Sequence, residues 1–285
     1  MSTQVTTAFV KQYSANVQLL VQQMGSRMRN AVTLETGKVG EEVFMDRISA
    51  TAPQKVTSRH ADSPLISTPH DRRRVTPIDY DWGDMIDNPD KLRMLIDPAS
   101  AYSANAAMAM GRAMDDVVIS AALGTAFTGE TGSTSQANTN QIVHGSAGLT
   151  IAKLRTAKET LDLGSVDPSI PRHIIVSPKQ ITDLLGTTEV TSSDFNTVKA
   201  LANGEINSFL GFNFIVSNRL AKSSTTRSCI AYAQDGIALA VGKDVNARID
   251  ERSDKSYATQ VYYCMSIGAT RMEEAKVVEV QCTES

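Results

Sequence analysis

The sequence predicts an α+β protein in which a long helix, an extended charged hairpin and an inserted α/β module belong to one chain. Residues 97–124 have the composition of a continuous helix, with an Asp-Pro start and a Gly stop. Residues 50–80 contain four prolines and five basic residues but little apolar content, so this segment cannot bury a core of its own. Helix and strand patterns then alternate between residues 150 and 216, as expected of an α/β module.

The long helix should begin at Asp97, with Pro98 at its first helical position, and end at Gly124. At 1.5 Å per residue it would be roughly 40 Å long. Its small and apolar residues share one face, which we expect to be buried: Ala106, Met110, Ala113, Val117 and Ala121. The opposite side would carry the polar residues Asn105, Arg112, Asp115 and Asp116. A buried face so rich in alanine predicts close packing against a sheet.

Composition limits the class of protein. With 285 residues and 41% hydrophobic residues, the chain can bury a core and form one large or two modest domains. A net charge of -3 argues against a protein that binds nucleic acid over its whole surface. No apolar run is long enough to cross a bilayer and the start lacks a secretory layout, so we expect a soluble protein made in a cytoplasm. Three cysteines without CxxC spacing suggest neither a disulfide framework nor a zinc site.

The first thirty residues predict an amphipathic helix from about Thr7 to Asn30, before a break at Gly37 and Gly40. Such a helix either packs on its own domain or reaches out as an arm to a neighbour. The sequence alone favours local packing, because most terminal helices dock locally. The residues at helical spacing are Phe9, Tyr13, Val17, Leu20, Met24 and Met28.

The charged segment should be a hairpin with one limb near 42–49, a second limb from 72 to 87, and a tip among 62–64. In the second limb Ile78, Tyr80 and Trp82 alternate with acids, which is the period of a half-exposed strand. One interpretation is a solvated charged hairpin. The other is a projecting loop that lays complementary charge on an adjacent copy. The charged residues in question are Arg72, Arg73 and Arg74, followed by Asp79, Asp81, Asp84 and Asp87.

The second half of the chain predicts a loop, an α/β module and closing strands. Residues 125–140 are rich in Gly, Ser, Thr and Asn and predict a flexible surface loop at a domain boundary. Beyond it we expect a helix from Thr150 to Gly164, a strand at 173–177, a helix from Ser177 to Gly186 and a strand at 209–216. Residues 227–241 predict two strands around a turn at 234–236. Residues 257–282 predict two further strands with a turn at 273–276. These two strands would pair with early strands, so that the middle of the chain becomes an insertion in one domain.

Catalytic motifs are not evident. The histidines His60, His70, His144 and His173 lack metal-ligand spacing, and ordinary surface histidines explain His60 and His70 better than a metal site does. HGSAG at 144–148 does not meet GxSxG, and GIALAVGK at 236–243 is not a phosphate loop. Asp115 and Asp116 diverge by about 100° on a helix and fit a polar face. We therefore expect no enzyme activity, no cofactor and no metal site.

Several stretches resemble the major capsid protein of tailed bacteriophages, whose shell fold is shared with herpesvirus capsids and encapsulins. They are TSRHADSPLISTPHDRRRV in the hairpin, WGDMIDNPDKLRMLIDPASAYSANAAMAMGRAMDD into the long helix, and GATRMEEAKVVEV near the end. The order of parts along the chain is similar as well.

The resemblance implies an N-arm (1–41), a peripheral domain (42–144) with an extended loop (50–80) and a spine helix (97–124), an axial domain (145–250), and closing peripheral strands (251–285). Arm and loop would clasp neighbouring subunits. The candidate inter-subunit residues are therefore Phe9, Tyr13, Arg72, Arg73, Arg74, Asp79, Asp81 and Asp84, with the arginines facing acids on a neighbour.

As function, the resemblance implies self-assembly as pentamers and hexamers into an icosahedral shell, in the host bacterial cytoplasm and then the virion. The shell would enclose double-stranded DNA without sequence-specific binding. Its partners would be a portal protein, possible decoration proteins and a separate scaffolding protein, since about forty residues before the first strand leave no room for a fused one. Lys55 is the only lysine of the loop, at its base, and we expect no covalent crosslinking. Two alternatives stay open: an encapsulin-like compartment, and an α/β enzyme with an unrecognised site, for instance around His173.

Overall fold

The computed structural model describes residues 22–60, 62–87, 99–186 and 208–284. The chain divides into two compact units that are each built from separate stretches of sequence. The first unit combines Met1–Ser26, Asp79–Arg112 and Asp244–Met265, and the second combines Arg27–Ile78, Ala113–Lys243 and Ser266–Ser285. Phe9, Tyr13, Asp97 and Pro98 lie outside the described residues, as does most of the predicted N-terminal helix.

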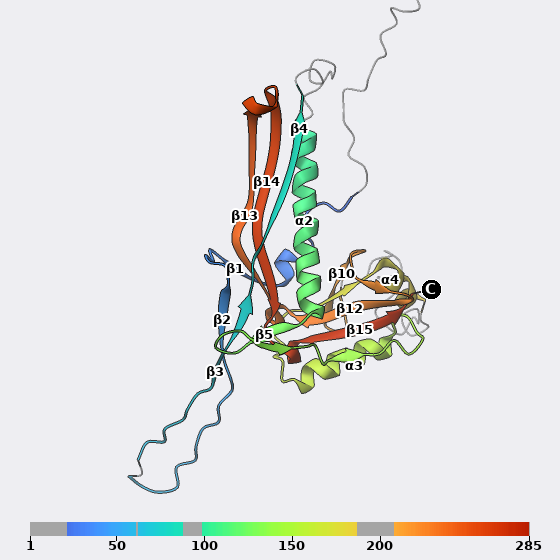
Figure 1. Cartoon of the computed structure of the whole chain (residues 1–285). Helices are drawn as coiled ribbons and strands as arrows, with labels where there is room; N and C mark the ends of the chain where they lie inside the picture. Colours follow the sequence, from blue (N-terminus) through green and yellow to red (C-terminus); the bar gives the residue numbers. More distant parts are fainter. Residues whose placement is uncertain (1–21, 61, 88–98, 187–207, 285) are drawn as a thin grey trace, which may run out of the picture. The chain divides into compact units, whose positions relative to one another are not determined.

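The first unit is built from long strands and the first half of a long helix (Figure 1). The strands are β4 (Ile78–Ile86), β13 (Ile237–Arg252) and β14 (Ala258–Arg271), hydrogen-bonded in the order β13–β14–β4. The short helix η4 (Ser253–Lys255) links β13 to β14. The predicted alternation along β4 is confirmed for residues 79–82, since Tyr80 and Trp82 are half-buried while Asp79 and Asp81 are exposed, but Ile78 is exposed as well.

The second unit contains a seven-stranded sheet of order β7–β15–β12–β8–β10–β9, with β11 paired to β12. Helix α3 (Ile151–Leu163) packs on β15 and β7, and α4 (Pro178–Leu185) follows β8. The core centres on the middle strands, where Ile174, Ile175, Ile230 and Val280 are fully buried. The strands are β7 (Gln141–Ile142), β8 (Arg172–Val176), β9 (Ser208–Phe209), β10 (Phe212–Val216), β11 (Lys222–Ser223), β12 (Thr226–Ala233) and β15 (Val277–Thr283).

A smaller sheet in the same unit has the order β2–β3–β5–β6. The predicted hairpin is confirmed at its base, where β2 (Val43–Ile48) pairs antiparallel with β3 (His70–Val75). Beyond it, residues 50–60 and 62–69 form no strand, and β4 pairs with β14 instead of extending the hairpin. In addition, β1 (Thr33–Thr36) pairs in parallel with the start of β13.

The long helix α2 (Ala99–Leu123) confirms the predicted spine, and the Gly124 N–H caps it by donating to the Ser120 carbonyl. The predicted buried face is correct at Ala106 and Met110 but shifts in the second half. There Met114, Val118 and Ala122 are buried, whereas the predicted Ala113, Val117 and Ala121 are only half-buried. A second stripe of the helix, formed by Gly111, Asp115 and Ile119, is buried as well. It is buried because the chain near residue 25 packs on the helix.

Three local predictions are wrong. Residues 22–28 are not helical, because Gly25 adopts φ 72° and the segment crosses α2; only η2 (Arg29–Ala31) forms a turn. The predicted loop at 125–140 forms β5 (Ala126–Thr128) and β6 (Thr134–Gln136), which pair as a hairpin. The predicted strand at 209–216 is split into β9 and β10 by a turn.

The remaining elements of the module are confirmed. The Thr150 hydroxyl caps α3 by accepting from the Lys153 N–H at 3.3 Å. Pro178 begins α4, although the Ser177 side chain makes no capping hydrogen bond. The predicted turn at 234–236 is η3 (Gln234–Gly236), which connects β12 to β13, and these two strands belong to different sheets. The predicted turn at 273–276 contains η5 (Glu274–Lys276), which connects β14 to β15. No helix in the described ranges is long and apolar enough to cross a membrane.

Candidate functional site

The three arginines of β3 do not share one environment. A strand turns successive side chains to opposite faces, so Arg73 points into the unit while its two neighbours point out. The Arg73 side chain is 0% exposed, and its Nη2 donates to both Glu274 carboxylate oxygens at 2.7 and 2.8 Å. Its Nε donates to the Met272 carbonyl at 3.0 Å. This differs from the expectation that Arg73 faces a neighbour's acids, because its charge is compensated within its own chain.

Glu274 also compensates a second buried arginine. Arg271 Nε lies 3.6 Å from Glu274 Oε1, and the Arg271 guanidinium donates to the carbonyls of Ala122, Gly124 and Gln136. Burial lowers the pKa of both arginines, and the attraction of Glu274 opposes that shift. The cluster joins the end of α2 to β3 and the β14–β15 connection, so it is a structural support for the base of the hairpin.

Arg72 and Arg74 lie at the surface of the same strand. Arg72 Nε is 3.3 Å from Asp46, with its guanidinium 5.7 Å from the centre of the Phe44 ring. Arg74 Nη1 is 3.1 Å from Glu42, with its guanidinium 4.8 Å from the centre of the Phe127 ring. Both keep exposed surface, and their contact with a neighbour stays a prediction.

A second ion pair fixes the outer end of the hairpin base. Asp71 accepts hydrogen bonds from Arg47 Nε at 2.8 Å, Thr128 Oγ1 at 2.7 Å and the Gly129 N–H at 3.1 Å. The Thr128 hydrogen bond, followed by those of Arg47, holds the pKa of the Asp71 carboxyl far below its usual range. Sequence reasoning missed this network, since Thr128 lies in the stretch predicted to be a loop.

The candidate acids of β4 belong to the first unit. Asp79 is exposed, Asp84 accepts from the Met85 N–H at 2.8 Å, and Asp81 accepts from the Tyr262 hydroxyl at 2.7 Å. The Asp81 hydrogen bond raises the pKa of Tyr262 to about 12. These contacts leave carboxylate oxygens available, and a role in contacts with a neighbour stays a prediction.

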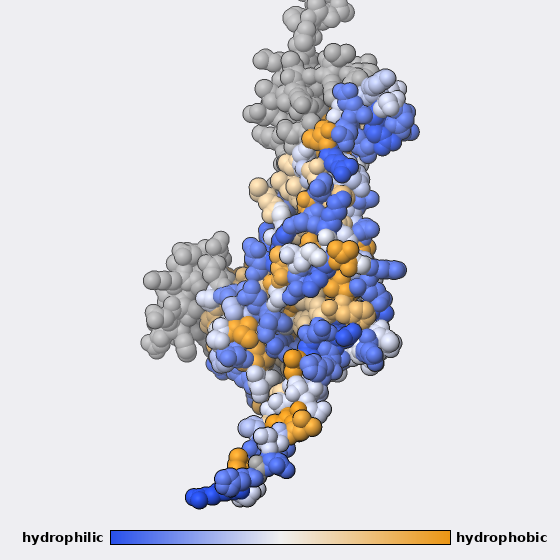
Figure 2. All heavy atoms as spheres, turned by 90° about the vertical axis from the view of Figure 1, so that its left-hand side faces the viewer, coloured by the Kyte–Doolittle hydropathy of each residue, from blue (hydrophilic) through white to orange (hydrophobic). Residues whose placement is uncertain are grey.

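The extended loop beyond the hairpin base carries apolar side chains that its own chain does not cover. The last backbone hydrogen bond of the ladder joins the Ser49 N–H to the Pro69 carbonyl, and residues 50–60 and 62–68 follow without strands. Val56 is 76% exposed and Leu65 is 97% exposed. Figure 1 shows the loop extending away from β2 and β3, and Figure 2 shows hydrophobic atoms on it at the bottom of the view.

The groups considered for chemistry are spread over the molecule. In the described part of the chain, no three His, Cys, Asp or Glu side chains come together as metal ligands. His60 and His70 are exposed on the loop and its base. His173 is half-buried on β8, 5.7 Å from the Tyr232 ring, and burial lowers its pKa. Cys229, Cys264 and Cys282 are free thiols.

Comparison with known proteins gives a family and a fold. The profile of a family described as phage capsid protein matches residues 5–284. No curated protein matches the chain.

Solved phage structures are similar over nearly the whole chain. The capsid of Cyanophage P-SCSP1u has a TM-score of 0.75 at 15% identity, covering 100% of this chain and 96% of that one. A chain from Mycobacterium phage Che8 has a TM-score of 0.74 at 14% identity, covering 95% of this chain and 96% of that one. The capsid of Ralstonia phage GP4 has a TM-score of 0.74 at 10% identity, covering 97% and 95%. At these identities the similarity establishes a shared fold.

Proposed function

This chain belongs to the phage capsid protein family, and we propose that it is the major capsid protein, which builds a closed shell from many copies of itself. The structural observation that supports this role best is the extended loop. Apolar side chains as exposed as Leu65 (97%) and Val56 (76%) gain no stability in the free subunit. They gain it once a second copy covers them.

The physical mechanism is association without a chemical step. Each copy would bury its loop and its N-arm on adjacent copies, and the partly exposed Arg72 and Arg74 would set the register against acidic side chains there. Single contacts of this kind are weak. In a closed symmetric shell they act together, so the assembly becomes far more stable than one interface.

The finer features of the role are part of this proposal. The subunits would form pentamers and hexamers in an icosahedral shell that is assembled in the host cytoplasm and becomes the virion capsid. A scaffolding protein and a portal protein would be its partners. The net charge of -3 suits a container for double-stranded DNA, because a strongly basic inner surface would hold the DNA and oppose its release.

The family match favours this role over the two alternatives. An encapsulin-like compartment shares the fold but holds enzyme cargo, and an enzyme needs a group of reactive side chains in a pocket. In the described residues His173 lies against Tyr232 and belongs to no group of three metal-binding side chains, which gives no support to an active site there.

Negative-stain electron microscopy of the purified full chain, expressed alone and with a scaffolding protein, tests the proposal. We expect closed shells, or sheets and tubes of hexamers, in at least one preparation. Monomers or small closed oligomers in both would overturn it. DNA and a portal in native particles would separate a virion from a cargo compartment.

A further inference from the structure

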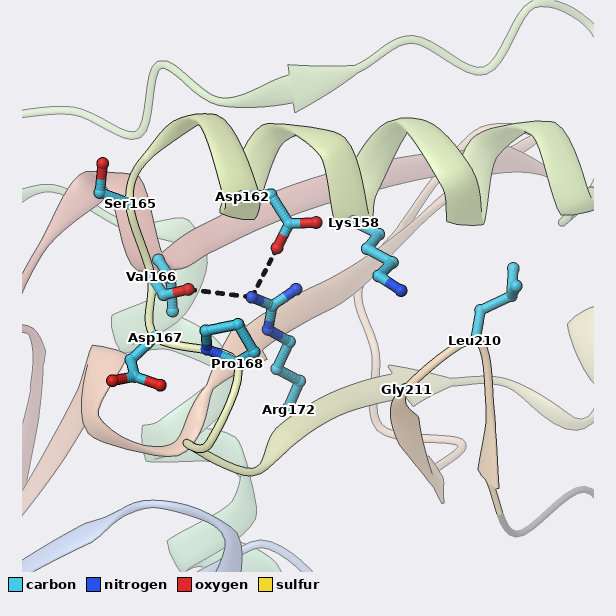
Figure 3. Close-up of a pocket in the computed structure, with 9 residues that line it drawn as sticks. All are labelled: Lys158, Asp162, Ser165, Val166, Asp167, Pro168, Arg172, Leu210 and Gly211. Atoms are coloured by element: carbon cyan, nitrogen blue, oxygen red, sulfur yellow. Dashed lines mark hydrogen bonds and ion pairs between the residues drawn. The ribbon is translucent and has the colours of Figure 1, made fainter.

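A cavity of about 620 Å³ opens beside the C-terminal half of α3 in the second unit (Figure 3). Its walls are α3, the turn at 165–168, the first residue of β8 and the turn between β9 and β10. None of the roles proposed above uses this cavity.

Arg172 lies at the bottom of the cavity with part of its hydrogen-bonding capacity unused. It is 6% exposed, and its Nη2 donates to Asp162 Oδ1 at 2.7 Å and to the Val166 carbonyl at 3.0 Å. The buried Nε finds no hydrogen-bond partner among the described residues. Leaving such a donor unpaired costs free energy, so a buried guanidinium in this state suits an additional acceptor.

Lys158 supplies a second cation to the same space. It is exposed on α3 and, in the part of the chain that the structure describes, makes no ion pair. Figure 3 shows its amine directed toward the side of the Arg172 guanidinium that faces away from Val166. Two cationic groups therefore approach the same cavity, whose lining also includes Asp162 and Asp167.

Two walls of the cavity contain left-handed residues. Leu210, an apolar residue at the β9–β10 turn, has φ 53°, and Ser165, in the turn after α3, has φ 56°. A left-handed backbone is unfavourable for a bulky residue such as leucine. Figure 3 shows Leu210 on the side of Lys158 away from Arg172, with its side chain directed from the turn toward α3.

We propose that this cavity binds an acidic side chain of a partner polypeptide, with its carboxylate between Arg172 and Lys158 and an adjacent apolar residue against Leu210. Arginine forms its strongest hydrogen bonds with carboxylates and phosphates. A carboxylate fits better here, because Asp162 already offsets the charge of Arg172 and Asp167 also lines the cavity, so a doubly charged phosphate would meet more repulsion. The partner is thus recognised by a single negative charge next to an apolar side chain.

A photo-crosslinking peptide tests the site in the full chain, whether or not it has assembled. The probe is acetyl-photoleucine-Glu-Leu-amide, with the labelled residues mapped by mass spectrometry. We expect labelling at 165–168 or 210–211, and competition by acetyl-Leu-Glu-Leu-amide at about tenfold lower concentration than by the glutamine analogue, as expected for loss of one charge-assisted hydrogen bond. Equal competition by the two peptides, or labelling elsewhere, would overturn the proposal.

Matched variants separate this cavity from general charge attraction. Lys158→Gln should weaken labelling several-fold, whereas Lys222→Gln, an exposed lysine on β11, should leave it unchanged. Both positions are exposed, so both variants should fold. Equal losses in the two variants would contradict the proposal. Stronger competition by inorganic phosphate than by the glutamate peptide would assign the site to phosphate and refute the carboxylate assignment.

Discussion

The Asp115 carboxylate on α2 accepts a hydrogen bond from the Met28 N–H at 3.2 Å, joining residues 87 positions apart in the sequence. The neighbouring Arg27 N–H also donates to both Asp115 oxygens, at 3.2 Å each. Asp115 is 0% exposed, although its place on a helix beside Asp116 suggested a polar surface. One buried carboxylate therefore fixes the point where the N-terminal segment leaves the long helix.

Replacement of Asp115 should destabilise the fold. Asp115→Asn keeps the size but leaves a neutral acceptor and adds a buried donor, so we expect a loss of about 1–3 kcal/mol in the free energy of unfolding. Urea unfolding of the free subunit measures it. Asp116→Asn is the matched control, since Asp116 is an exposed partner of Arg219 and should contribute less than about 1 kcal/mol. Equal losses in the two variants would contradict the role given to Asp115.

Gly111 allows the same segment to cross α2 at close range. A Cβ at this position would lie 2.4 Å from the Gly25 carbonyl carbon and 2.6 Å from the Ser26 nitrogen. In an exposed helix, Gly→Ala stabilises by roughly 1 kcal/mol. Here Gly111→Ala should destabilise by about 1–3 kcal/mol, because the clash is with backbone.

Hydrogen exchange at the Ser26 amide, with urea unfolding, checks this prediction. We expect faster exchange in Gly111→Ala than in the natural chain. Ala107→Gly at an exposed position of the same helix serves as the propensity control and should cost about 1 kcal/mol without altering exchange at Ser26. A stabilised Gly111→Ala variant would show that the segment moves away at no cost.

The sequence could predict the elements with strong local signals but not the partners that are distant in sequence. Helix α3 was predictable from its Thr150 cap and the spacing of its apolar residues. The turn before β15 was predictable because residues 273–276 are mostly polar and interrupt an alternating strand pattern. Burial of Asp115 depends on amides 87 residues away, and no local pattern carries that information. The separation of Arg73 from its neighbours was available from the period of two along a strand, once β3 was assigned.

Removing the Glu274 charge should cost more than removing an exposed partner. Glu274→Gln would leave Arg73 and Arg271 buried without a compensating charge, and we expect a loss of about 3–5 kcal/mol. Arg72→Ala, whose side chain is 44% exposed, should lose less than about 1 kcal/mol. Differential scanning calorimetry of the free subunits compares them, and similar melting temperatures would refute the structural role of the cluster.

The Asp71 network predicts part of the acid sensitivity. The pKa of the Asp71 carboxyl is lower in the folded chain than in the unfolded chain, mainly through Thr128. Its contribution is therefore complete above the unfolded pKa of about 4 and is lost as pH falls below it. Thr128→Val should destabilise by about 1 kcal/mol at pH 7, and its difference from the natural chain should shrink between pH 4 and 2. Urea unfolding across this range measures it, and a difference independent of pH would exclude the coupling.

The extended loop should matter for assembly and not for folding. Leu65→Ser removes an apolar side chain that is 97% exposed, so the unfolding free energy of the free subunit should change by less than about 0.5 kcal/mol. If neighbouring copies bury Leu65, the same variant loses about 2 kcal/mol of association free energy at every copy of the contact, and the sum over a shell is large.

Sedimentation should then show a smaller fraction of the Leu65→Ser protein in shells. Val143→Ser, at a position 70% exposed and outside both the loop and the N-arm, is the control and should assemble normally. Normal shells from Leu65→Ser would place the loop's contacts elsewhere, whereas equal failure of both variants would reflect general surface polarity instead of a contact at Leu65.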